Sequence, residues 1–245
     1  EVYFGGAWRT VLVGTQGRGG KSVYALDITN PDGFAANKVL WEYTHTSLGQ
    51  TTGTPVITRL NDGNWAVVVG NGYNSTSGVA VLLLVDLETG AVQRITTQSG
   101  SSSSPNGLSG VAVVSSRNNG VADLVYAGDL AGHLWKFDLT SSTPANWKVA
   151  FGTSSAPLPL FTASSGRAIT SAPDVTRDAS GTGYVVVFGT GRYLAVSDNS
   201  TTGTQALYGV RDQGSPVAST DLVSQSVLGT ASGTGGDSRT YRITS

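Results

Sequence analysis

Three groups of residues have types and spacings that could support chemistry. Residues 14–22 read GTQGRGGKS and follow an apolar run, as a phosphate-binding loop does. His133 is one of only two histidines, and with a serine and an aspartate it could form a hydrolytic triad. Residues 115–123 read SSRNNGVAD and have oxygen-bearing side chains at calcium-loop spacing. The sequence therefore raises nucleotide, hydrolase and metal hypotheses.

The first two hypotheses are weak. A phosphate-binding loop needs glycine where Thr15 stands, and an apolar run at residues 23–27 follows instead of a helix. We therefore interpret residues 14–22 as a glycine-rich hairpin. No segment resembles a nucleophile elbow, and His133 precedes an apolar run, so we interpret it as a polar turn residue.

The third hypothesis stays open. Asn119, Gly120 and Asp123 fit positions 5, 6 and 9 of a calcium loop, so Asn119 and Asp123 are the candidate metal ligands. Ser115 is a poor first ligand, and Arg117 brings a positive charge to position 3. The pattern favours a plain turn, and the alternative is a bound Ca²⁺ as the protein's one cofactor.

A fourfold repeat dictates which elements must position these residues. Short apolar runs ending in glycine occur at residues 10–14, 66–70, 124–128 and 185–189, with the glycines 56, 58 and 61 residues apart. A second apolar run ending in aspartate follows at residues 23–27, 81–86 and 134–138, and in the fourth copy at 193–198 or 206–212. Strand repeats of this length are typical of β-propellers.

The repeat also predicts roles for its own polar and aromatic residues. Asp27, Asp86 and Asp138 each end a strand, so we expect their carboxylates to accept backbone N–H groups of the following turn. We expect the tryptophans at or within strands to pack between neighbouring sheets; they are Trp8, Trp41, Trp65 and Trp135. Both roles are structural and not catalytic.

Composition limits the other classes of function. The net charge is −1 with 13% charged residues, so no basic field for nucleic acid exists. No stretch reaches the roughly 20 apolar residues of a membrane span. Cysteine is absent, which excludes disulfides and thiolate chemistry. We therefore expect that the protein does not bind nucleic acid and that this chain does not itself span a membrane.

One full unit, residues 54–97, predicts a four-stranded antiparallel meander whose middle strands are apolar on both faces. The fold class is therefore all-β, a β-propeller with four-stranded blades. We expect residues 1–245 to form a single propeller domain or part of one, with repeats at approximately 1–52, 53–106, 107–168 and 169–245. Because the first copy begins at its second strand and few residues follow the fourth, we expect an incomplete ring.

The same segments carry a family resemblance. Residues 8–14, 24–27, 40–42, 48–49, 65–73, 126–130, 132–138, 169–173 and 188–194 occur in one order. This series resembles the C-terminal β-propeller of the PilY/PilC proteins, adhesins associated with the tips of type IV pili. The resemblance implies an exported protein of the bacterial surface or pilus tip, Gram-negative in origin, that promotes pilus assembly and extension and mediates adhesion. Its implied partners are minor pilins at the pilus tip and a host or abiotic surface receptor.

The resemblance also implies a calcium loop of the form D-x-[DN]-x-D-G-x-x-D that regulates pilus extension and retraction. This loop falls on residues 115–123, which depart from the pattern at Ser115, Arg117 and Asn119. The metal site is therefore degenerate in this chain.

Two alternatives remain beside a non-enzymatic adhesin. Residues 25–27 and 85–90 also resemble the repeats of quinoprotein dehydrogenases, which bind pyrroloquinoline quinone. The other alternative is a purely structural propeller scaffold. For the adhesin we expect the working surface in the variable turns at residues 16–22, 71–78 and 98–107, because exposed loops on rigid scaffolds are where recognition usually resides.

Overall fold

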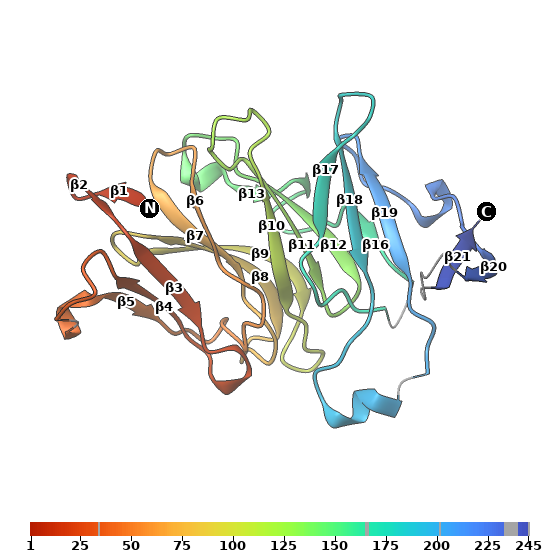
Figure 1. The fold of residues 1–245 in the computed structure, drawn as a ribbon, viewed down its shortest axis with the longest axis horizontal. Coiled ribbons are helices and arrows are strands. Elements are labelled where there is room, and N and C mark those ends of the chain that lie inside the picture. The colour runs from red at the N-terminus through yellow and green to blue at the C-terminus, as the bar shows by residue number, and fades with distance from the viewer. Residues whose placement is uncertain (34, 165–166, 201, 233–239, 245) are drawn as a thin grey trace.

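The structure is a computed structural model that describes residues 1–33, 35–164, 167–200, 202–232 and 240–244. Four antiparallel sheets stand side by side in chain order, from the red and orange sheet near the N-terminus to the teal and light-blue sheet toward the C-terminus (Figure 1). Short 3₁₀ helices occur only in connections: η1 (Gly17–Gly19), η2 (Ala36–Lys38), η3 (Pro144–Asn146), η4 (Val196–Ser200) and η5 (Ser219–Asp221). None of the helices in the described residues is long and apolar enough to cross a membrane.

The second sheet is the complete unit of the array. It has the order β6 (Val56–Arg59), β7 (Trp65–Gly70), β8 (Val79–Asp86) and β9 (Val92–Gly100). All its pairings are antiparallel, so the meander predicted for residues 54–97 is confirmed.

The other sheets repeat this plan with variations. The first contains β3 (Val11–Thr15), β4 (Val23–Asp27) and β5 (Val39–Tyr43). The third contains β10 (Leu108–Val114), β11 (Leu124–Asp129), β12 (His133–Asp138) and β13 (Lys148–Val149), and β16 (Phe161–Thr162) also pairs with β12. The fourth contains β17 (Asp174–Arg177), β18 (Tyr184–Gly189) and β19 (Leu207–Asp212).

Three two-stranded hairpins complete the described structure: β1 (Val2–Phe4) with β2 (Ala7–Arg9), β14 (Phe151–Gly152) with β15 (Pro157–Leu158), and β20 (Val227–Ser232) with β21 (Thr240–Thr244). Within the described residues the sheets form an open array and not a closed ring (Figure 1).

Each gap between neighbouring sheets holds its own hydrophobic core. Val67 and Val69 of β7 pack toward the first sheet, whereas Val68 packs toward the third. Because successive side chains of a strand point to opposite faces, a sheet between two neighbours must be apolar on both. This explains the uninterrupted apolar runs in the sequence. A third core joins the third and fourth sheets around Phe161 and Phe188.

The innermost strands approach one another closely at small residues. A Cβ on Gly53 would lie 2.6 Å from the Cα of Gly110, and one on Gly110 would lie 3.0 Å from the Cβ of Ala172. Contacts below 3.0 Å are incompatible with a side chain, so glycine at position 53 lets the second and third sheets meet.

The strand-end aspartates have the predicted role. In each case the backbone N–H of a threonine in the following turn donates to the carboxylate. The pairs are Thr29 with Asp27 (3.0 Å), Thr89 with Asp86 (2.7 Å) and Thr140 with Asp138 (2.9 Å). In the fourth copy, Gly214 N donates to Asp212 at 3.0 Å. Asp212 is thus the fourth member of the series, and residues 193–198 lie in a connection.

The prediction for the tryptophans is wrong in one case. Trp41 and Trp135 are buried between sheets, and the indole N–H of Trp41 donates to the carbonyl of Leu87 in the second sheet at 3.0 Å. Trp65 is partly buried against the same core as Trp41. Trp8, however, is 63% exposed: among the described strands β2 pairs with β1 alone, and the Trp8 ring lies edge-on to the Tyr3 ring.

Asp27 makes folding dependent on pH. Hydrogen bonds from the Thr29 side chain and backbone, assisted by the Arg9 guanidinium 2.7 Å away, lower the pKa of Asp27 to about 2. An aspartate in an unfolded chain has a pKa of about 3.9, so the stabilisation is present above that pH and is lost as pH falls toward 2. We expect Asp27→Asn to be less stable than wild type at pH 7.

Urea unfolding at several pH values measures this difference, which we expect to shrink between about pH 4 and pH 2. A difference independent of pH would show that the ionised carboxylate of Asp27 does not stabilise the fold.

Candidate functional site

The three variable turns lie together at one end of the sheets. They connect β3 to β4, β7 to β8 and β9 to β10, and antiparallel meanders place alternate connections at the same end (the lower edge in Figure 1). Lys21 donates to the carbonyl of Asn74, and Asn106 N donates to the carbonyl of Gly78 at 2.8 Å. We call residues 16–22, 71–78, 98–107 and 190–200 the loop face.

The fourth segment of the loop face was not predicted from the sequence. Arg18 donates to the carbonyl of Leu194 at 2.6 Å, which links the first turn to the connection between β18 and β19. Hydrogen bonds from the backbone N–H groups of Leu194 and Ala195 lower the pKa of Asp198 and fix this segment. It exposes Tyr193 (64%) and Val196 (84%). The signal available in the sequence was the presence of apolar residues, Tyr193 and Val196, in a long segment between two strands.

A cavity of about 550 Å³ opens beside the loop face. Its wall combines exposed Tyr193, the Arg18 side chain and the hydroxyl-bearing Thr52 and Ser171 with the inner strands. Tyr73 also lines it; burial raises the pKa of the Tyr73 phenol, and its hydroxyl donates to the carbonyl of Thr170 at 3.2 Å. An aromatic ring, a guanidinium and hydroxyls are groups that bind polar surface ligands.

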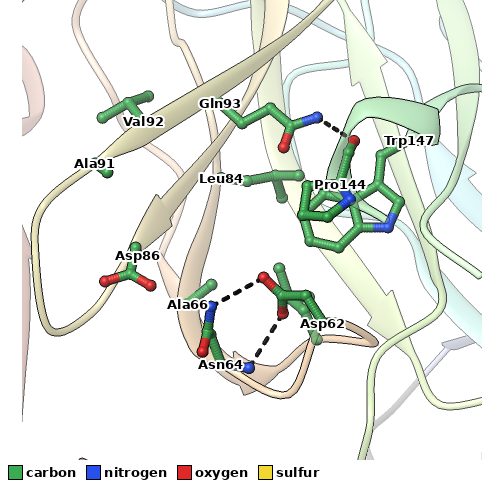
Figure 2. A pocket seen from close by; sticks show the side chains of 11 residues that line it. Asp62, Asn64, Ala66, Leu84, Asp86, Ala91, Val92, Gln93, Pro144 and Trp147 are labelled. Atoms are coloured by element: carbon green, nitrogen blue, oxygen red, sulfur yellow. Dashed lines mark hydrogen bonds between the residues drawn. The ribbon is translucent and has the colours of Figure 1, made fainter. Parts of the chain in front are cut away.

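A smaller cleft of about 250 Å³ lies at the opposite end, between the second and third sheets (Figure 2). Its floor is apolar, and Gln93 closes one side by donating to the carbonyl of Pro144 at 2.6 Å. Asp62 and Asp86 line it, and neither has an ion-pair partner among the described residues. The cleft is therefore acidic and apolar at once.

The loop of residues 115–123 connects β10 to β11, at the end of the sheets away from the loop face. Asp123 is fully buried, and its two oxygens accept hydrogen bonds from the N–H (2.8 Å) and hydroxyl of Ser116. The side-chain oxygen of Asn119 accepts from the Ser115 hydroxyl and from Val121 N, both at 3.1 Å. The two candidate metal ligands, Asn119 and Asp123, thus accept hydrogen bonds from different groups of the loop.

This donor set does not fit a calcium ion. Ca²⁺ takes 6–8 oxygen ligands, whereas the loop offers one carboxylate whose oxygens are already bonded, with the Arg117 guanidinium 3.4 Å away. Nowhere in the described part of the chain do three or more His, Asp or Glu residues group as metal ligands would. The metal assignment of Asn119 and Asp123 stays a prediction for titration to test.

A serine of the second sheet does meet a histidine and an aspartate of the third, but the three do not form a proton relay. Ser99 Oγ lies 3.3 Å from His133 Nδ1, and the same nitrogen lies 2.9 Å from Asp129 Oδ2. A triad needs the serine and the aspartate on opposite ring nitrogens. Asp129 also accepts from the Trp135 indole and the Asn106 amide, both at 2.8 Å. The cluster is a buried hydrogen-bond network that holds the turn from β11 to β12.

Residues 14–22 form the glycine-rich hairpin expected from the sequence. η1 is a single 3₁₀ turn between β3 and β4, and the segment enters a strand and not an α-helix. It therefore lacks the helix N-terminus that a phosphate-binding loop uses.

These features define a class of protein: an all-β array of blade-like sheets with exposed loops at one end. Comparison with known proteins gives the family. Residues 1–233 match the family model described as the PilY1 beta-propeller domain. The chain therefore belongs to the PilY1 β-propeller family, and its fold is a β-propeller.

Similar proteins support this assignment. A type IV pilus biogenesis factor PilY1 homolog of Xylella fastidiosa is 42% identical over 234 residues, covering 89% of this chain and 16% of the relative. The type IV pilus biogenesis factor PilY1 of Pseudomonas aeruginosa PAO1 is 40% identical, covering 87% of this chain and 20% of the relative. The chain thus spans about a fifth or less of the length of these two relatives.

A solved structure agrees over almost the whole chain. The crystal structure of the Pseudomonas aeruginosa PilY1 C-terminal domain superposes with a TM-score of 0.87 and 37% sequence identity. The match covers 99% of this chain and 55% of that one.

Proposed function

We propose that this chain is the recognition part of a type IV pilus-associated surface protein that promotes pilus assembly and extension and attaches cells to surfaces. The family assignment supports the pilus role, since the relatives are named pilus biogenesis factors. The observation that carries the attachment role is the loop face, where four connections meet on a rigid β scaffold.

The proposed partners follow from this assignment. Minor pilins at the pilus tip bind the protein during assembly, and a host or abiotic surface is recognised through the loop face. The place of action is the exterior of the cell, at the pilus tip. The cavity beside Tyr193 and Arg18 is where we place a bound surface ligand.

The proposed role is non-catalytic. The arrangement of Ser99, His133 and Asp129 around a single ring nitrogen supports this, because it offers no proton relay. Dye-linked alcohol oxidation after incubation with pyrroloquinoline quinone and calcium is the direct test, and turnover would overturn the non-catalytic proposal.

We expect Tyr193→Ala combined with Val196→Ser to reduce surface attachment at least about tenfold, since buried aromatic anchors contribute 2 kcal/mol or more to binding interfaces. Surface pili, counted separately, remain at the wild-type level because both side chains are exposed and support no core. The measurement is cell attachment alongside pilus counts in a strain that carries the variant in the full protein.

Val39→Ser is the matched control, because Val39 is 46% exposed at the start of β5, away from the loop face. Attachment unchanged by the Tyr193 variant, or lost equally in the Val39 control, would contradict recognition at the loop face. Loss of pili in the Tyr193 variant would assign this surface to assembly instead.

A further inference from the structure

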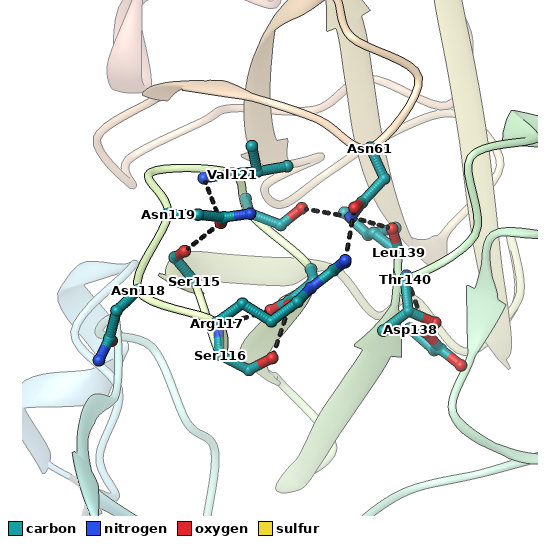
Figure 3. A network of polar contacts seen from close by, with 12 residues as sticks. Asn61, Ser115, Ser116, Arg117, Asn118, Asn119, Val121, Asp138, Leu139 and Thr140 are labelled. Atoms are coloured by element: carbon teal, nitrogen blue, oxygen red, sulfur yellow. Dashed lines mark hydrogen bonds and ion pairs between the residues drawn. The ribbon is translucent and has the colours of Figure 1, made fainter.

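The loop of residues 115–123 contains a cation of its own. Arg117 lies at the third position of the loop, where a calcium loop has an oxygen ligand. Its guanidinium donates to Asp123 Oδ2 at 3.4 Å and to Asn61 Oδ1 at 2.6 Å (Figure 3). A positive group therefore bridges two oxygens that come from different sheets.

Asn61 extends this bridge into the second sheet. It lies in the turn between β6 and β7, and its amide donates to the carbonyls of Ala122 (3.2 Å) and Leu139 (2.9 Å) of the third sheet (Figure 3). Within the described residues, the three hydrogen bonds of the Asn61 side chain thus all reach the third sheet or its connections, one of them through Arg117.

A second arginine approaches the loop from the fourth sheet. Arg177 of β17 donates to the carbonyl of Ser116 at 2.6 Å and to Asn118 Oδ1 at 3.3 Å. Its guanidinium carbon also lies 5.8 Å from the centre of the Tyr184 ring. The loop therefore contacts two guanidinium groups and contains one carboxylate. A divalent cation placed there would be repelled by both arginines and would have to displace the hydrogen bonds of Asp123.

We propose that the Arg117 guanidinium takes the part that a calcium ion plays in an oxygen-ligand loop, and that residues 115–123 form a calcium-independent clamp between the second, third and fourth sheets. A guanidinium suits this part because it is always charged and directs several donors at separate oxygens. The clamp keeps the loop ordered at any calcium concentration. This proposal concerns the loop alone and does not rest on the proposed pilus function.

Calcium titration of the purified chain is the first test. We expect no saturable heat on adding CaCl₂ up to about 5 mM, above the dissociation constants of weak extracellular calcium modules. We also expect the same unfolding temperature in calcium, in magnesium and in chelator. A calcium-specific heat that disappears in Asp123→Asn would overturn the proposal and establish Asp123 as a metal ligand.

Variants of Arg117 form the second test. We expect Arg117→Gln to lower the unfolding temperature by about 3–6 °C, because two charge-assisted hydrogen bonds are lost. Arg94→Gln is the control: Arg94 is an exposed arginine of β9 without an ion pair among the described residues, and we expect a change below about 1 °C. Equal effects of the two substitutions would show that Arg117 does not clamp the loop.

A reconstructed calcium loop is the third test. Combining Ser115→Asp, Arg117→Asp and Asn119→Asp supplies carboxylates at positions 1, 3 and 5. In chelator we expect this triple variant to unfold at a lower temperature than wild type. On adding CaCl₂ we expect its unfolding temperature to rise by at least about 3 °C. A variant that gains no more from calcium than wild type would contradict the idea that the guanidinium stands in for the ion.

Discussion

Asp212→Ala is expected to lower the free energy of unfolding by about 3–5 kcal/mol, because it leaves a buried cation without its carboxylate partner. Asp212 accepts a hydrogen bond from the Tyr126 hydroxyl and forms an ion pair with Lys136, whose ammonium lies 2.6 Å from Oδ2. Only 1% of the Asp212 side chain and 13% of the Lys136 side chain are exposed. Without the Asp212 carboxylate, the Lys136 ammonium loses its partner, and little water can reach the ammonium to solvate it.

The network also ties two sheets together. Tyr126 belongs to β11 and Lys136 to β12 of the third sheet, whereas Asp212 ends β19 of the fourth. Burial, followed by the hydrogen bond to Asp212, raises the pKa of the Tyr126 phenol, so the phenol is held in its donor form. The expected loss therefore combines a broken ion pair with a weakened contact between sheets.

Asp138→Ala is the matched control for this prediction. Asp138 ends β12 at the equivalent point of the third repeat, but among the described residues its carboxylate accepts hydrogen bonds from the N–H and hydroxyl of Thr140 alone. We expect its substitution to cost about 1 kcal/mol, the usual value for a local cap. Urea unfolding at pH 7 compares the two variants, and similar losses would contradict a special role for the buried network.

A compensated variant separates the ion pair from simple packing. Asp212→Leu combined with Lys136→Met and Tyr126→Phe removes the three polar side chains of the network at once and leaves only the Gly214 N–H that donated to Asp212. Replacing buried ion pairs by apolar residues is often neutral or stabilising. We therefore expect this triple variant to be more stable than Asp212→Ala. A triple variant less stable than the single one would show that shape, and not charge, decides the cost.

Asp129→Ala is expected to have an effect of similar size, about 3–5 kcal/mol, for a different reason. Asp129 is fully buried and accepts four hydrogen bonds, from the backbone and ring of His133, the Trp135 indole and the Asn106 amide. Each donor left unsatisfied in the interior costs about 1–3 kcal/mol. Thermal and urea unfolding measure the loss.

Ser99→Ala distinguishes this network from a catalytic one. Ser99 contacts His133 at 3.3 Å and accepts from Asn106 at 2.9 Å, so its removal weakens the network only at the edge. We expect a cost below about 1 kcal/mol and unchanged pilus counts. Ester hydrolysis by the wild-type protein that is lost in a stably folded Ser99→Ala protein would revive the hydrolase hypothesis, because a triad needs that hydroxyl as its nucleophile.

Local features of this protein could be predicted from the sequence because their partners are neighbours along the chain. The strand-end aspartates bond to N–H groups two or three residues ahead, so Asp27, Asp86 and Asp138 could be assigned without a structure. The spacing of the four glycine-ended runs likewise predicted the strands and the blade-like sheets. Trp8 was misassigned because strand membership alone does not say whether another sheet covers the strand.

Features that join distant residues required the tertiary structure. Arg117 meets Asn61, 56 positions earlier in the chain, and Lys136 meets Asp212, 76 positions later. The sequence marked Asp212 as one of two candidate ends of the fourth repeat, but it did not show that Lys136 pairs with Asp212 or that Arg18 reaches the connection at Leu194. Such contacts depend on how the twisted sheets pack against one another, and that packing fixes which ends of which strands become neighbours.

The sequence by itself determined the repeat, the all-β class and the capped turns, because these follow from alternation and from hydrogen bonds within a few residues. Only the tertiary structure decided that the variable turns share one end, that residues 115–123 lie at the other, and that a guanidinium stands beside the carboxylate of Asp123. The physical reason is that burial and charge pairing are properties of the packed sheets and not of any one segment.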